Sequence, residues 1–189
     1  MLDRLIKVLL IEDNPGDVRL VREMLGEARG SFQIETAERL HDGLQLLAAD
    51  HVDVLLLDLG LPDSTGIDTF LKAQIRAPEV PIIIMTSLYD EETAAEAVRH
   101  RAQDYLVKGV VDGNLLTHSV EYAIERNRLE QEFDHFFMLS LDLLAIAELS
   151  GNLKRISASW ERLLGFSREE YIAKPLLEFV HPDDRDISA

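Results

Sequence analysis

The chain has 189 residues, and its 19 basic against 35 acidic residues give a formal net charge of −16. Such an acidic chain lacks the basic surface that nucleic acid or an anionic membrane requires, so we expect neither as a partner. The absence of cysteine excludes disulfides and thiolate metal sites. No apolar run approaches the ~20 residues of a membrane helix, and the start of the chain is not typical of a signal peptide. We therefore expect a cytoplasmic protein.

Short apolar runs alternate with amphipathic segments in the first two thirds of the chain. The runs expected to form strands are residues 8–11, 32–36, 52–58, 80–85 and 104–107. Several are continuously apolar, which is typical of parallel strands that are covered on both faces. Helical stripes between them are formed by Val18, Val21 and Leu25, and by Leu40, Leu44 and Leu47. The pattern predicts a doubly wound α/β domain with a five-stranded parallel sheet over residues 1–128.

A long helix is predicted over residues 113–138, overlapping the last helix of this domain. Residues 114–139 contain no proline or glycine. Tyr122, Arg126, Leu129, Phe133 and Phe136 recur at spacings of four, three, four and three, which resembles a heptad repeat. The pattern favours a connector helix that pairs two copies of the chain in a homodimer. The alternative is a surface helix that folds back on the domain.

Five polar side chains follow the predicted strands at the points where the strands end. Glu12 and Asp13 follow the first strand, and Asp58 closes the third. Thr86 and Lys108 follow the fourth and fifth strands. One such residue alone is more often a helix cap or a solvated loop residue, but their coincidence at four strand ends indicates a site.

The chemistry of these residue types suits phosphoryl transfer. Carboxylates that converge repel one another unless a cation is present, and Mg²⁺ prefers carboxylate, water and phosphate oxygens. An aspartate beside such an ion can act as a nucleophile toward phosphorus. A hydroxyl and an ammonium group can bind the oxygens of the transferred group. The sequence therefore favours a site that handles a phosphoryl group.

Four motifs in order, VLLIEDN, LLLDLGLPDSTG, IIIMTS and DYLVK, resemble the response-regulator receiver family of two-component signalling, which is CheY-like. The resemblance covers about residues 5–128. It implies a flavodoxin-like sheet of order 2-1-3-4-5. It also implies that Asp58 accepts a phosphoryl group from a sensor histidine kinase or a histidine phosphotransfer protein. The chain would then catalyse only its own phosphorylation and dephosphorylation.

The resemblance further assigns roles to residues around the acceptor. Asp13, Asp58 and the backbone carbonyl of Gly60 would hold Mg²⁺ or Mn²⁺, with Glu12 reaching the ion through water. Thr86 and Lys108 would hold the phosphate, and Tyr105 would turn inward when Thr86 binds it. The family usually has proline after the lysine, in a cis peptide, whereas this chain has Gly109. Glycine can reach a similar turn with a trans bond.

Residues 139–189 differ in character from the part before them. Residues 141–149 and 153–156 are predicted strands joined by a tight turn at Ser150-Gly151-Asn152, and short helical pieces follow. The motif WERLLGFSREE and the closing HPDDR resemble the beginning of a PAS sensor domain. We expect the N-terminal part of this α+β domain, without its later strands.

Two other functions are alternatives to a phosphorylation switch. A phosphatase of the haloacid dehalogenase-like family requires an Asp-x-Asp motif after the first strand, and Glu12-Asp13-Asn14 does not supply it. A phosphate-independent interaction module of receiver shape would be expected to have lost its acceptor, lysine or acids. All of these residues are present, so the phosphorylation switch is the preferred hypothesis.

Overall fold

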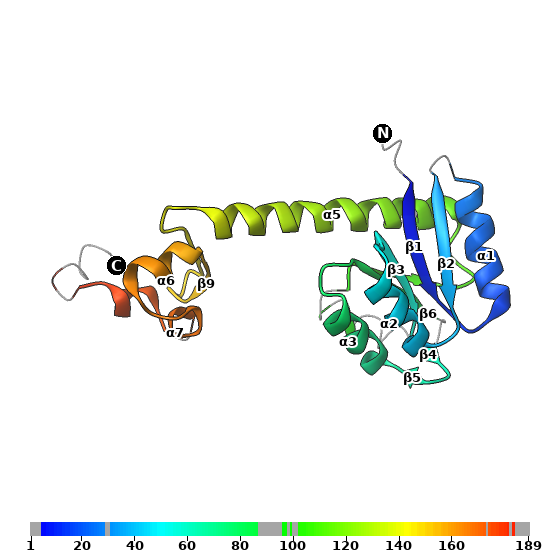
Figure 1. Cartoon of the computed structure of the whole chain (residues 1–189), viewed down its shortest axis with the longest axis horizontal. Coiled ribbons are helices and arrows are strands. Elements are labelled where there is room, and N and C mark those ends of the chain that lie inside the picture. Colours follow the sequence, from blue (N-terminus) through cyan, green and yellow to red (C-terminus); the bar gives the residue numbers. More distant parts are fainter. Residues whose placement is uncertain are drawn as a thin grey trace. The chain divides into compact units, whose positions relative to one another are not determined.

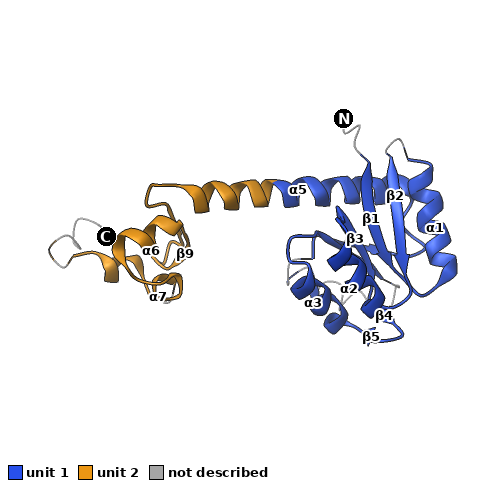
Figure 2. Cartoon of the chain, viewed as in Figure 1, with its two compact units in different colours: residues 1–128 blue, residues 129–189 orange. Residues whose placement is uncertain are grey.

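The computed structural model describes residues 5–28, 31–86, 96, 97, 99, 102–172, 174–181 and 183. The chain divides into two compact units, Met1–Arg128 and Leu129–Ala189 (Figure 2). Residues 87–95 and most of the HPDDR motif lie outside the described residues. Within the described ranges, no helix is long and apolar enough to cross a membrane.

The first unit is built on a five-stranded, all-parallel sheet (Figure 1). Its strands are β1 (Ile6–Ile11), β2 (Phe32–Ala37), β3 (Val54–Asp58), β6 (Ile82–Thr86) and β7 (Asp104–Val107). Their order is β2-β1-β3-β6-β7, which is the order 2-1-3-4-5 when only these strands are counted. The predicted parallel sheet is therefore confirmed, and each strand lies within two residues of its expected ends.

Helices cover both faces of this sheet. Successive residues of a strand point to opposite faces, so Leu9 and Ile11 join one core while Val8 and Leu10 join the other. The helices α2 (Leu40–Ala49) and α3 (Ile67–Arg76) pack on the first core, and α1 (Pro15–Gly26) and α5 (Gly113–Leu139) pack on the second. This double covering explains why the strands read as continuous apolar runs.

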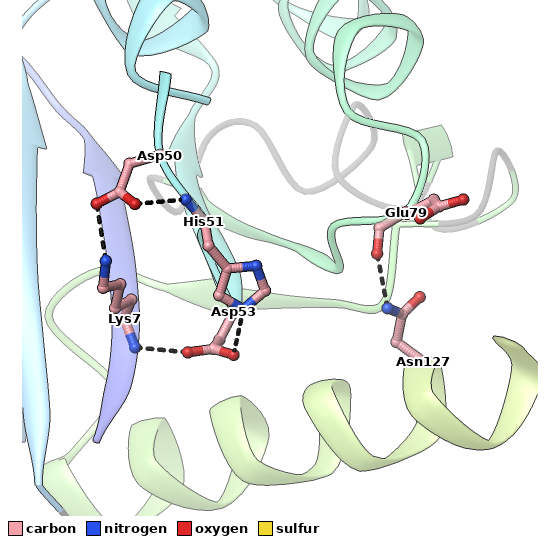
Figure 3. Close-up of polar contacts among 6 residues, drawn as sticks. All are labelled: Lys7, Asp50, His51, Asp53, Glu79 and Asn127. Atoms are coloured by element: carbon pink, nitrogen blue, oxygen red, sulfur yellow. Dashed lines mark hydrogen bonds and ion pairs between the residues drawn. The ribbon is translucent and has the colours of Figure 1, made fainter. Parts of the chain in front are cut away.

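Polar contacts close the edge of the sheet where the strands begin (Figure 3). The Lys7 amide donates a hydrogen bond of 2.8 Å to Asp53, and the Lys7 ammonium pairs with Asp50 at 2.7 Å. The Asn127 amide of α5 donates a hydrogen bond of 2.7 Å to the carbonyl of Glu79, ahead of β6. These contacts lie at the amino ends of the strands and leave their carboxyl ends for the acidic residues.

Helix α5 is 27 residues long and matches the range expected for the connector helix. The five heptad-like positions named above form a seam along α5, and three of them, Tyr122, Leu129 and Phe136, are more than half exposed. Phe133 contacts Phe137, and the guanidinium of Arg155 lies 5.4 Å from the ring centroid of Phe133. The C-terminal turns of α5 thus form part of the second unit. Within residues 129–139, Phe137 is buried.

The second unit is a small α+β arrangement. Its elements are β8 (Ala145–Ala147), β9 (Leu153–Ile156), α6 (Ala158–Leu164), α7 (Arg168–Ile172) and the 3₁₀ helix η1 (Leu176–Phe179). β8 and β9 pair antiparallel, so the predicted hairpin is present, but the strand expected over residues 141–149 spans only three residues. All three β8 residues are exposed, which leaves no packed face to extend the strand. The fully buried Tyr171 packs against the rings of Trp160, Phe166 and Phe179.

Candidate functional site

Pairing of β1 with β3 brings three carboxylates together. Ile11 lies opposite Leu57 in the parallel register, so Glu12 and Asp58 are the next residues of the two strands. One carboxylate oxygen from each of Glu12, Asp13 and Asp58 lies within 4.8 Å of the others. The convergence that the sequence predicted at this edge is therefore present in the structure.

Lys108, which follows β7, supplies the positive charge at this cluster. Its ammonium lies 2.9 Å from Asp58 Oδ2, 2.5 Å from Glu12 Oε2 and 3.1 Å from Asp17 Oδ2. Burial alone would lower the pKa of Lys108, but hydrogen bonds and charges from Asp58 and Glu12 outweigh it and raise the pKa above its usual range. Lys108 is therefore a fixed cation over the physiological pH range.

Glu12 is the most buried acid of the cluster, with 1% of its side chain exposed. Burial raises the pKa of Glu12, the hydrogen bond from Lys108 partly offsets this rise, and the charge of Asp58 adds to it. The amide of Asn14 also donates a hydrogen bond of 3.1 Å to Glu12. Burial is thus the main cause of the raised pKa of Glu12, and the contact with Lys108 opposes it.

The donor set fits a small, hard divalent cation. Three carboxylates at mutual distances of at most 4.8 Å can hold Mg²⁺ or Mn²⁺, since such ions prefer oxygen ligands and keep several waters. Bound there, the ion would neutralise charge on a phosphoryl group and on the acids. The ligand role of the Gly60 carbonyl stays a prediction, because the contact that Gly60 makes with Asp58 is through its amide, which donates a 3.2 Å hydrogen bond.

The structure places the predicted switch residues on neighbouring strands. Asp58 lies opposite Met85 in β6, so Thr86 is the following residue of that strand, and it is almost fully buried. Tyr105 lies on β7 opposite Ile84, with 38% of its surface exposed. The amide of Lys108 donates a hydrogen bond of 2.8 Å to the carbonyl of Thr86. Thr86 and Lys108 thus reach the same edge through backbone pairing of β6 and β7.

Gly109 makes the turn that follows Lys108. Its φ is +80°, a backbone conformation that residues other than glycine rarely adopt. No cis peptide occurs among the described residues. The turn therefore uses a trans peptide and a positive φ where the receiver pattern uses proline. Lys108 still reaches Asp58 from this backbone.

Three further residues make contacts that were not predicted from the sequence, at the site or in the elements next to it. Asp17 in the first turn of α1 contacts Lys108. Gly43 of α2 faces Ile11, and a Cβ built on it would lie 2.2 Å from Ile11 Cδ1. Asp63 accepts hydrogen bonds of 2.9 Å from the amides of Leu40 and His41 and so caps α2. For Gly43, the available signal was a glycine within an apolar helical stripe, which indicates close packing. Asp17 and Asp63 gave no such signal, because their roles depend on contacts with residues distant in the sequence.

A pocket of about 310 Å³ opens beside the acids. Its lining includes Glu12, Asp13, Val18 and the arginines Arg19 and Arg22. Asp13 is exposed at this pocket, whereas Glu12, which also lines it, is buried.

Comparison with known proteins agrees with this geometry. Residues 8–120 match the family described as the response regulator receiver domain. The chain is 33% identical to the regulatory protein LuxO of Vibrio cholerae over 67% of this chain and 27% of that protein. It is 32% identical to the response regulator protein PilR of Pseudomonas aeruginosa over 58% of this chain and 24% of that protein. The chain thus spans about a quarter of the length of these relatives.

Solved structures give the same result. A response regulator receiver domain protein from Clostridium thermocellum is 25% identical, with a TM-score of 0.59, and the match covers 66% of this chain and 98% of that one. The shared fold, the carboxylates at the ends of β1 and β3, and the matched residues lead to one assignment. The chain belongs to the response regulator receiver domain family.

Proposed function

We propose that this chain is a phosphorylation switch in which Asp58 accepts a phosphoryl group in a reaction that requires Mg²⁺ or Mn²⁺. The donor would be the phosphohistidine of a sensor histidine kinase or of a histidine phosphotransfer protein. The observation that carries the proposal is the meeting of Glu12, Asp13 and Asp58 within 4.8 Å, with Lys108 bound to Asp58. Family membership supports the same reaction.

Each residue has a defined part in this chemistry. An Asp58 carboxylate oxygen attacks phosphorus and forms the P–O bond, while the P–N bond of the donor breaks and the imidazole leaves with the electron pair. Lys108 and the hydroxyl of Thr86 would bind oxygens of the transferred group. Asp13, Asp58 and the Gly60 carbonyl, with Glu12 acting through water, would hold the divalent cation, which would neutralise charge on the transferred group.

The phosphoryl group would act on the rest of the chain through helix α5. Phosphorylation adds about −1.5 to −2 charges at Asp58, which draws the Thr86 hydroxyl toward the new oxygens. Tyr105 then turns into the space that Thr86 leaves. We propose that α5 responds to this change and pairs two copies of the chain, because its exposed seam offers apolar side chains for a partner helix.

The second unit would receive the signal. The hairpin β8–β9, the helices that follow it and the aromatic core around Tyr171 agree with the resemblance to the first part of a PAS domain. We therefore propose a relay from Asp58 through α5 to a PAS-like segment.

Binding of beryllofluoride, a stable mimic of the phosphoryl group, tests the proposed chemistry. We expect one equivalent to bind the wild-type chain in a Mg²⁺-dependent manner, measured by isothermal titration calorimetry. Asp58→Asn should abolish binding because the carboxylate oxygen that coordinates beryllium is lost. Asp68→Asn, an equal change in the first turn of α3, is the control and should bind normally. Failure of the wild type to bind would favour a phosphate-independent interaction module.

A further inference from the structure

Lys108 is held by a carboxylate that does not belong to the cation cluster. Its ammonium contacts Glu12 and Asp58, which are two of the three clustered acids, and also Asp17 at 3.1 Å. Asp17 lies in the first turn of α1, whereas Lys108 follows β7, so the fold joins two distant parts of the chain at this contact. Neither the receiver pattern nor the cation cluster accounts for Asp17.

The contacts of Lys108 compete with those of a divalent cation. The ammonium occupies oxygens of Glu12 and Asp58, and a cation bound to the same carboxylates would repel it at close range. Lys108 must therefore loosen these contacts when a cation binds. A charged side chain of which only 18% is exposed is costly without a partner, because little of it can be solvated.

Asp17 offers the partner that this exchange needs. Its carboxylate already contacts the Lys108 ammonium, 32% of its side chain is exposed, and it is not one of the three acids that meet at the cation cluster. We propose that Asp17 is a positioning residue that retains Lys108 while Glu12 and Asp58 turn to the cation. This inference rests on the proposed function, because it concerns the affinity of the same site for its cation.

A double-mutant cycle tests the inference through Mg²⁺ affinity, measured on the full chain by isothermal titration calorimetry. Asp17→Asn should weaken Mg²⁺ binding by about three- to tenfold, since Lys108 would then remain on Glu12 and Asp58. In a Lys108→Met background the same change should have less than about a twofold effect, because no ammonium needs a partner. Asp68→Asn, also in the first turn of a helix, should leave affinity unchanged.

The outcomes distinguish a positioning role of Asp17 from a direct effect of its charge on the cation. An equal loss in both backgrounds would show that Asp17 acts on the cation by its charge alone and would overturn the inference. Unchanged affinity for Asp17→Asn would overturn it as well. Circular dichroism checks that each variant is folded. If Lys108→Met does not fold, Lys108→Gln is used in its place. Wild-type protein that fails to bind Mg²⁺ would overturn the proposed function together with the inference, whereas the other failures leave the function standing.

Discussion

At the scale of single residues, the site combines a buried acid with a fixed cation. Glu12 has a raised pKa chiefly because it is buried, although Lys108 donates to it. Ionising Glu12 in the folded, metal-free protein therefore costs free energy. The ionised Glu12 carboxylate, which the cation requires, therefore lowers the stability of the metal-free protein.

Glu12→Gln should make the metal-free protein more stable than wild type near neutral pH. Below the ordinary Glu pKa of 4.5, Glu12 is protonated in both the folded and unfolded wild type, and the two proteins should differ little. As pH rises, the unfolded wild type ionises first, so wild-type stability falls relative to the variant until pH exceeds the raised folded pKa. Urea unfolding with a chelator across this range measures the difference, and a gap that shrinks with rising pH would contradict the prediction.

At the scale of elements, helix α2 is packed against the strand that carries the acid pair. Gly43 faces Ile11, the last residue of β1, and Glu12 follows directly. The contact leaves no room for a methyl group, since the Cβ would lie 2.2 Å from Ile11 Cδ1 and 2.6 Å from Cγ1. The distance between α2 and β1 thus helps to position the site.

Gly43→Ala should lower the free energy of unfolding by about 1–3 kcal/mol, because overpacking at Ile11 outweighs the better helix propensity of alanine. Mg²⁺ binding should weaken at the same time, as Ile11 moves the acids that follow it. Gly26→Ala is a matched control, because a Cβ on Gly26 meets no atom within 4 Å. Chemical denaturation and calorimetry measure both effects, and equal behaviour of the two variants would refute the packing account.

The strands and the main site residues were predictable because each residue directly follows an apolar run. To predict Asp58 and Lys108 as site residues, it was enough to locate β3 and β7 and to apply the rule that the carboxyl ends of parallel strands lie at one edge of the sheet. Asp17 was not found, since its role arises from a contact with Lys108 that local pattern does not encode. The strand over residues 141–149 was predicted too long because apolar residues there are exposed in the second unit, and composition alone does not reveal burial.

At the scale of the whole molecule, helix α5 belongs to both units, since it spans Gly113–Leu139. Its proposed partner is the same helix of a second copy. Leu129→Asp should weaken dimerisation by at least about tenfold, because it replaces an apolar side chain of the seam with a charge. Ile75→Asp, the same kind of change on an exposed position of α3, is the control. Sedimentation equilibrium measures both, and a monomeric wild type with or without beryllofluoride would contradict the pairing.

The most direct test of the account is intact-mass spectrometry after incubation with Mg²⁺ and acetyl phosphate, a small phosphoryl donor. We predict a single adduct of about 80 Da that hydroxylamine removes, as expected for an acyl phosphate. The adduct should be absent from Asp58→Asn and present in Asp68→Asn. An unmodified wild type under conditions where it binds Mg²⁺, or an adduct that persists in Asp58→Asn, would contradict the assignment of Asp58 as the phosphoryl acceptor.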